Sequence, residues 1–179
     1  QTAEDLENEI PSNNNTMIAL QQRVFSRSNV GVFFINRESF KDYDFLKSED
    51  EYNRVLGIDY SLASKDNTWN GKFFTHKSFQ PGDNDGNLAT GATMRYNSRI
   101  FNVFAKAVFI DDDFRSDLGF VRRTDLFKTI FSVERVFWPK KGIVQNHSFQ
   151  FFPNIRWSPS LDFQNTDYDL QGRYEMQFN

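Results

Sequence analysis

Cysteine is absent from the 179 residues of this chain. Its absence excludes disulfide frameworks, thiolate metal sites and cysteine nucleophiles, although it does not fix the compartment. Long apolar runs are missing as well: no stretch of about 18 apolar residues occurs, so the sequence predicts no transmembrane helix. Charge of one sign is also missing, because 21 basic and 24 acidic residues are well mixed, and this argues against a nucleic-acid partner.

The start of the chain lacks both a methionine and a basic-then-apolar signal peptide. Residues 1–16, "QTAEDLENEIPSNNNT", are acidic and rich in Asn, and we expect a linker or a processed N-terminus there. Residues 17–179 are expected to form one β-structured segment.

Aromatic side chains are what the sequence has in excess. They make up 17% of the chain, with 21 Phe, 6 Tyr and 3 Trp, yet the mean hydropathy is -0.63. Many aromatics combined with a polar average are typical of strands that have one aromatic-rich face and one polar face.

The alternation is clearest at residues 168–178, "YDLQGRYEMQF". Leu170, Tyr174 and Phe178 alternate there with polar residues such as Asp169 and Arg173. A period of two residues places the apolar side chains on one face of a strand and the polar ones on the other.

Similar stretches recur along the chain, joined alternately by short turns and longer loops rich in Gly, Pro, Asn and Asp. Pro153 interrupts one of them and predicts a bend or bulge. The fold class predicted is therefore all-β, an antiparallel up-and-down meander of about nine long strands. The predicted strands are residues 17–25, 30–38, 52–64, 68–79, 88–98, 100–110, 126–138, 143–157 and 168–178.

The period alone does not distinguish a soluble sheet from a membrane sheet, because either has one polar face. Three further features favour lipid. The predicted strands have about 10 to 13 residues, against a usual 5 to 6. Aromatic residues such as Trp69, Trp138 and Trp157 lie near strand ends, and turns alternate with loops as at the two rims of a barrel. The sequence therefore favours part of a transmembrane β-barrel.

Four segments carry a family resemblance: "RSNVGVFFINRESF" at 27–40, "YNRVLGIDYSL" at 52–62, "NTWNGKFFTHKSF" at 67–79 and "DDDFRSDLGFVRRTD" at 111–125. In this order they resemble the C-terminal region of a Bacteroidetes family of large outer-membrane proteins of unknown function. Members of that family carry an N-terminal carbohydrate-binding family-9-like module. The motif residues kept here are Gly119, Phe120, Val121 and Arg123.

The last segment resembles a family pattern of the form F-N-P-E-V-G-F-V-P-R, from which this chain departs in three places. Ser116 and Asp117 stand where Pro and Glu often occur, and Arg122 stands where a second Pro is usual. The resemblance implies an outer-membrane location in a Gram-negative bacterium, and it implies that the chain is a fragment of a larger barrel. It implies no catalytic residue and no cofactor.

Charged residues in the middle of predicted strands are candidates for facing a polar lumen. Arginines that recur along the strands, including Arg95, Arg135 and Arg173, either select solutes or form a ladder of cross-strand ion pairs, and we favour the ladder. The candidate lumen-facing residues are Arg54, Asp59, Lys72, His76, Arg95, Lys128, Glu134, Arg173 and Glu175.

Candidate sites for chemistry are weak. The run Asp111, Asp112 and Asp113 has the oxygen ligands that Ca²⁺ prefers, but a solvated loop that pairs with nearby arginines is the favoured interpretation. His76 and His147 are the only two histidines, and a metal pair would require them to be close together. We therefore expect no metal site and no enzyme activity.

The sequence predicts an outer-membrane β-barrel segment with a channel, transport, export or anchoring role. Its partners would be the lipid bilayer and the rest of the same polypeptide or an outer-membrane protein. The alternative is a soluble extracytoplasmic β-module that binds glycan or a partner protein.

Overall fold

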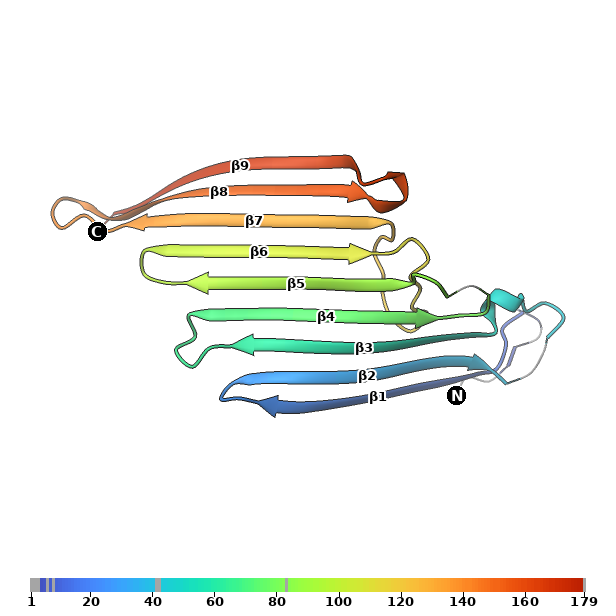
Figure 1. Ribbon diagram of the computed structural model, residues 1–179. Helices are drawn as coiled ribbons and strands as arrows, with labels where there is room; N and C mark the ends of the chain where they lie inside the picture. The colour runs from blue at the N-terminus through green and yellow to red at the C-terminus, as the bar shows by residue number, and fades with distance from the viewer. Residues whose placement is uncertain (1–3, 6, 8, 41–42, 83, 179) are drawn as a thin grey trace.

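Figure 1 shows the computed structural model of the chain, which describes residues 4–5, 7, 9–40, 43–82 and 84–178. Nine strands lie side by side in one sheet in the order of the sequence, and every neighbouring pair is antiparallel. The predicted up-and-down meander is therefore confirmed. The strands are β1 (Asn13–Val24), β2 (Ser28–Ser39), β3 (Tyr52–Ala63), β4 (Trp69–Phe79), β5 (Leu88–Asn97), β6 (Phe101–Ile110), β7 (Leu126–Phe137), β8 (Val144–Ser158) and β9 (Gln164–Phe178).

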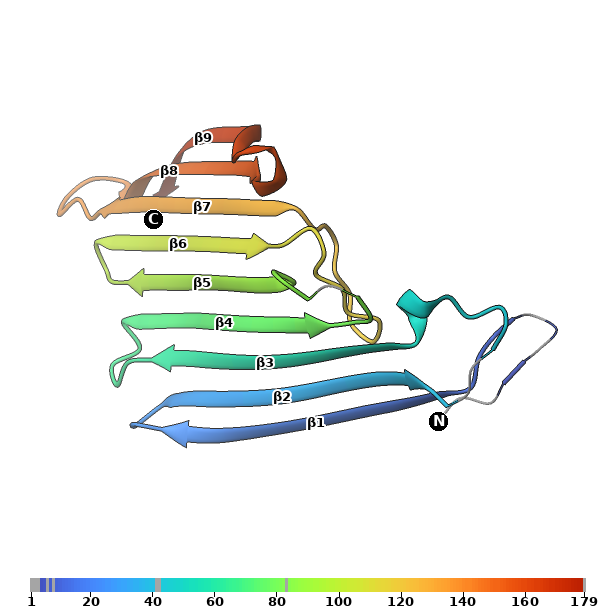
Figure 2. The same cartoon turned by 45° about the vertical axis from the view of Figure 1, so that its right-hand side comes forward.

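The sheet is open. Its two edge strands, β1 and β9, do not pair with each other, and they lie at opposite sides of the sheet in Figures 1 and 2. The first strand begins at Asn13, before the predicted start at Met17. The sequence prediction placed the end of the segment at residue 179, which lies outside the described residues. No helix in the described part of the chain has the length and apolar character needed to cross a membrane.

The two ends of the sheet differ. One end, here called the turn end, carries the connections 25–27, 64–68, 98–100 and 138–143, and the opposite loop end carries 40–51, 80–87, 111–125 and 159–163. Asn67 has a φ of 64° in its tight turn, a left-handed conformation that Asn tolerates. The predicted alternation of short turns and longer loops holds as far as β7, and the last two connections are of similar length.

Pro153 does not shift the register, so the predicted bulge is not found at this residue. It pairs with Leu170 of β9, while the ladder between β7 and β8 omits the pairs around Phe131 and Ser132. The missing ladder pairs reflect the absent N–H of proline. The register shifts in β8 lie instead between Val144 and Asn146 and between Arg156 and Trp157.

Cross-strand pairing sorts the strand residues into two faces, because directly opposed residues point to the same side. Asp59, for example, pairs with Phe74 and Gly31, while Ile58 pairs with Thr75 and Val32. We call the side that carries Asp59 the polar face and the side that carries Ile58 the aromatic face. The aromatic face includes Leu20, Val32, Phe34, Leu56, Ile58, Tyr60, Phe73, Met94, Phe131, Phe149, Phe151, Leu170, Tyr174 and Phe178.

The small buried core lies on the polar face at the loop end. Val55 and Ala89 are buried there beneath Phe114, which comes from the connection between β6 and β7. Figure 2 shows this connection descending from β6 across the ends of the neighbouring strands. We call residues 111–125 the β6–β7 loop.

Candidate functional site

The polar face brings together almost all of the candidate lumen-facing residues. The register places Asp59, Lys72, His76, Arg95, Lys128, Glu134, Arg173 and Glu175 on this one face. Arg54 lies on the aromatic face, where it pairs with Asn36 and Phe79, and it must be removed from that set. Its alternation with Leu56 and Ile58 already assigned it to that face.

Ion pairs and hydrogen bonds join neighbouring strands on the polar face. The Asp59 carboxylate lies 3.7 Å from the Lys72 ammonium and 3.4 Å from His76 Nε2. Arg156 pairs with Asp167 across β8 and β9. Glu134 accepts a hydrogen bond of 2.8 Å from the amide of Asn102 on β6. These cross-strand contacts fix neighbouring strands in register.

The recurring arginines contact aromatic rings more than they form the predicted ladder of ion pairs. The guanidinium carbon of Arg95 lies 5.2 Å from the ring centre of Phe104, and that of Arg135 lies 5.0 Å from Phe137. The recurring arginines are Arg54, Arg95, Arg123, Arg135 and Arg173. Among the described residues, two of these five form a side-chain ion pair: Arg173 with Glu175 at 3.5 Å and Arg54 with Glu38 at 3.2 Å. Cation–π contact therefore replaces most of the ladder.

The aromatic face inverts the usual distribution of burial. Leu20 is 72% exposed and Ile58 is 54% exposed, whereas the small residues Asn53 and Ser78 on the opposite face are buried. A contiguous apolar surface of this kind marks contact with lipid or with another protein surface.

Charged strand residues on the aromatic face lie only near its two ends, within the described residues. They are Glu38, Arg54 and Lys77 toward the loop end, and Arg135 toward the turn end. Lys77 donates hydrogen bonds to the backbone oxygens of Asn84 and Gly86 in the adjacent loop. Between these ends lies an uncharged band, which runs on β3 from Leu56 to Leu62.

Aromatic pairs occupy both ends of the band. At the turn end the rings of Trp69 and Tyr96 lie 4.9 Å apart, and Trp138 Nε1 donates to the backbone oxygen of Arg99. At the loop end the rings of Phe127 and Trp157 lie 5.2 Å apart. Tryptophan and tyrosine favour the boundary between an apolar layer and water.

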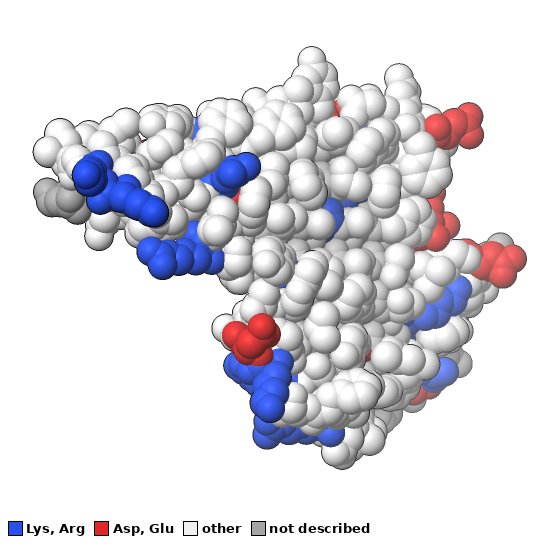
Figure 3. Space-filling view, turned by 60° about the vertical axis from the view of Figure 1, so that its left-hand side comes forward, with Lys and Arg blue, Asp and Glu red and all other residues white. Residues whose placement is uncertain are grey.

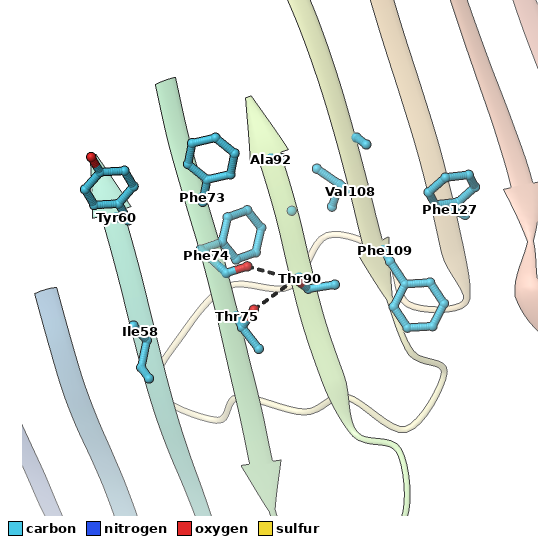
Figure 4. A pocket seen from close by; sticks show the side chains of 12 residues that line it. Ile58, Tyr60, Phe73, Phe74, Thr75, Thr90, Ala92, Val108, Phe109 and Phe127 are labelled. Carbon is cyan, nitrogen blue, oxygen red and sulfur yellow. Dashed lines mark hydrogen bonds between the residues drawn. The ribbon is translucent and has the colours of Figure 1, made fainter. Parts of the chain in front are cut away.

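A shallow groove of about 530 Å³ lies in the middle of the aromatic face. Figure 4 shows Tyr60 and Phe73 on one side of it and Phe127 on the other, with the small side chain of Ala92 between them. The hydroxyls of Thr75 and Thr90 lie 3.0 Å apart, and Thr90 also donates to the backbone oxygen of Phe74. The hydroxyls of both threonines in the groove are therefore hydrogen-bonded within the sheet.

The two ends of the sheet differ in their charges. The turn end has several cations and few acids, whereas the loop end has many acids together with cations such as Arg115 and Arg123. Figure 3 shows a broad uncharged surface, with most blue atoms toward one side and most red atoms toward the other, although one red group lies among the blue atoms. The turn-end cations are Arg23, Arg27, Lys65, Arg99, Lys140 and Lys141, and the loop-end acids include Asp44, Glu49, Asp50, Glu51, Asp111, Asp112, Asp113 and Asp117.

The acid at the turn end, Asp66, forms the closed turn between β3 and β4. Its carboxylate accepts hydrogen bonds from the Thr68 hydroxyl at 2.6 Å, from the Ser64 hydroxyl at 2.7 Å and from the Thr68 backbone N–H at 3.1 Å. The Thr68 hydroxyl, followed by that of Ser64, lowers the pKa of Asp66 from 3.8 to about 2. Hydrogen bonds to the charged form explain this direction.

The β6–β7 loop is anchored to the rest of the sheet by Arg115. Its guanidinium lies 2.6 Å from Asp50 and 2.6 Å from Asp117, and Arg37 of β2 lies 3.1 Å from the same Asp117. The buried amide of Asn53 completes the anchor, because it donates to the Arg115 backbone oxygen and accepts from the Asp117 N–H.

Phe114 seals the loop against the polar face. It is 7% exposed and packs with Val55 and Ala89, with Phe33 and Phe74 at the margin. At its loop end, the polar face therefore carries apolar side chains, and the β6–β7 loop covers them. Burial of apolar surface of this kind stabilises at about 25 cal/mol per Å².

The family-motif residues lie in the second half of this loop. Gly119 donates to the Ser116 backbone oxygen at 3.2 Å, and a Cβ at this position would lie only 2.5 Å from the Ser116 hydroxyl. Val121 packs on the small core, while Phe120 is 89% exposed. Arg123 lines a cavity on the polar face. The turn over residues 116–119 therefore brings Gly119 close to Ser116.

Candidate metal and catalytic groups do not converge. No group of three or more ligating side chains is found in the described ranges. Arg115 pairs with Asp50 and Asp117 rather than with the Asp111–113 run. His76 lies on the polar face and His147 on the aromatic face, so the two histidines cannot bind one metal ion together.

Comparison of the chain with protein-family models, with curated proteins and with solved structures finds no match. The resemblance to the Bacteroidetes family therefore stays a prediction. The structure itself defines the class: an open nine-stranded antiparallel sheet with one aromatic and one polar face.

Proposed function

We propose that the chain forms part of an outer-membrane β-barrel, in which the aromatic face contacts lipid and the polar face lines an aqueous lumen. The role would be passage or anchoring at the outer membrane, with no chemistry of its own. One observation carries the proposal: the largest apolar side chains are exposed on one face, in a band without charge.

The dimensions of the band support this assignment. On β3, Arg54 and the turn at Ser64 bound the uncharged stretch and lie ten residues apart. At about 3.3 Å per residue and a tilt of about 45°, such a stretch spans about 23 Å. Apolar bands of outer-membrane barrels are about 25 Å tall.

The contacts of the polar groups in the band, and of the charged groups at its two ends, also suit lipid. An unpaired hydroxyl in hydrocarbon costs several kcal/mol. Thr75 and Thr90 bond to each other and to the backbone, Lys77 reaches back to the loop end, and Arg135 lies over Phe101 and Phe137. The basic turn end would lie among lipid phosphates, which attract Lys and Arg.

The proposal also requires that the open sheet be closed into a barrel. Edges do not persist in hydrocarbon, because each would expose a row of unpaired N–H and C=O groups. Further strands, from the same polypeptide or from another copy, would have to connect β9 to β1.

The alternative is a soluble β-module that binds glycan or a partner protein. Its most suitable surface is the groove of Figure 4, where the stacked rings of Tyr60 and Phe73 could hold a sugar ring. Sugar binding also needs free hydrogen-bonding groups beside the rings, and the hydroxyls of Thr75 and Thr90 are already bonded. The lipid assignment is therefore preferred.

The chain lacks cysteine, so single-cysteine labelling tests the proposal directly. Ile58→Cys places a fluorophore on the aromatic face, and Ser61→Cys places one on the polar face of the same strand. After refolding into vesicles, we expect brominated lipid to quench the label at position 58 and aqueous iodide to quench the label at position 61. A β-rich monomer that forms in plain buffer, with both labels quenched by iodide, would refute the proposal and support the soluble module.

A further inference from the structure

The polar face contains a cavity of about 670 Å³ between the β6–β7 loop and strands β4 to β9. Arg122 and Arg123 line it from the loop, and Lys128 and Arg156 line it from β7 and β8. Lys128 and Arg156 are direct cross-strand partners. Two distant parts of the chain thus bring four basic side chains to one cavity.

The acids around this cavity do not balance its cations. Asp167 is the carboxylate among the lining residues, and it already pairs with Arg156. Asp125, near Arg123, accepts hydrogen bonds from Ser158 and Ser160. Lys128 forms no ion pair with any described residue, and it lies within electrostatic reach of Arg156, Lys106 and Arg122. Like charges held together in a partly buried site attract a counter-ion.

Much of the remaining lining of the cavity is apolar. It includes Phe74, Phe114, Leu126 and the exposed ring of Phe120. A volume of about 670 Å³ lies within the range of sites that bind small organic molecules. A simple hydrated anion would contact the cations alone, whereas an anion with an apolar body would contact both the cations and the apolar lining.

We propose that this cationic cavity binds an organic anion, a carboxylate, sulfonate or phosphate carried on a flat apolar body. Lys128 and Arg123 contact the anionic group, and Phe74 and Leu126 contact the apolar body. The inference goes beyond the proposed membrane role and does not depend on it, because one chain forms the whole cavity.

The test uses naphthalene-2-sulfonate as the probe and the neutral naphthalen-2-ylmethanol as its matched control. Binding is measured on the full chain, in whichever medium keeps it folded, plain buffer or a non-ionic detergent. We expect the sulfonate to bind at least tenfold more tightly than the alcohol, and its affinity to fall with added salt. Loss of one charge-assisted contact is worth about 1.5 kcal/mol, so Lys128→Gln and Arg123→Gln should each weaken binding about tenfold.

Lys72→Gln is the matched control, because Lys72 is a cation of the same face that pairs with Asp59 and does not line this cavity. It should change the affinity less than twofold, and Lys128→Arg should keep it. Equal binding of the alcohol, no binding of the sulfonate, or equal weakening by Lys72→Gln would overturn the proposal. Arg123 lies in an exposed loop segment, so its variant keeps the test valid if a β7 variant misfolds. Failure of this test leaves the labelling result at positions 58 and 61 unaffected.

Discussion

A charge placed in the middle of the aromatic face should separate the lipid-facing sheet from a soluble one. Ile58 is the residue for this substitution, because its side chain is 54% exposed and Ile58→Arg therefore disturbs no packed core. Ile58 lies four residues from Arg54 and six from Ser64, about 13 Å and 20 Å along β3. It is thus near the centre of the uncharged band.

The expected cost depends on the medium around that band. An arginine at the middle of a lipid-facing strand costs about 2–4 kcal/mol, and the cost falls to about 0–1 kcal/mol near the interface. In water, a surface substitution away from any special feature costs within about 0.5 kcal/mol. Leu62→Arg is the depth control, because Leu62 shares the face and lies about 13 Å further along the strand, close to the turn.

The assay is urea unfolding of the chain refolded in lipid vesicles, followed by fluorescence of the three tryptophans. We expect Ile58→Arg to lower the free energy of unfolding by about 3 kcal/mol, and Leu62→Arg by less than about 1 kcal/mol. Ser61→Arg on the polar face should cost little, since Asp59 lies on the same side of the strand. Equal and small losses at positions 58 and 62 would refute the lipid assignment.

Three further predictions concern the connections of the sheet. Phe114→Ala should lower the free energy of unfolding by about 3 kcal/mol in a denaturant titration, because it leaves a cavity against buried neighbours; a loss below about 1 kcal/mol would contradict the packing. Arg115→Met should speed proteolysis within residues 111–125 by removing both loop ion pairs, whereas Arg122→Met, which removes no ion pair with a described residue, should not; equal rates would contradict the anchor. The Asp66 carboxyl should titrate by NMR with a pKa of about 2, and Thr68→Ala should raise that pKa toward 3.8. Because folding lowers this pKa, the stability from Asp66 is present above about pH 4 and is lost as the pH falls toward 2; an unshifted titration would contradict the turn geometry.

The alternation of apolar and polar residues predicted the strands, because it depends only on neighbouring residues in the sequence. In β9, Leu170, Tyr174 and Phe178 occupy one face and Asp169 and Arg173 the other, as the period of two requires. The same parity sorted the polar face correctly, and it would have excluded Arg54 if it had been applied to β3 from Leu56 backward. Strand number and order followed from the turns between the stretches.

The cover of the polar face was not predicted, since it depends on contacts between distant residues. Arg115 reaches Asp50, and Asn53 contacts the backbone of residues 115 and 117, and no local pattern encodes either contact. The sequence nevertheless contained a signal for the covered patch: short runs of consecutive apolar residues, in which the alternation fails. "VFFI" at 32–35, "FF" at 73–74 and "VFI" at 108–110 put apolar groups on both faces, and Phe33, Phe74 and Ile110 pack on the small core.

These runs of consecutive apolar residues bear on both proposals, because they place apolar side chains on the polar face. A water-filled lumen disfavours large apolar side chains, because water would contact them. Phe33, Phe74 and Ile110 nevertheless lie on the polar face. Their presence is explained by the β6–β7 loop, which covers them with Phe114 and Val121. If the sheet closes, that loop lies inside the barrel and narrows it at the loop end. A solute on the polar face would then pass the cationic cavity at the narrowest point, where Lys128 and Arg123 have the greatest influence on which charges enter.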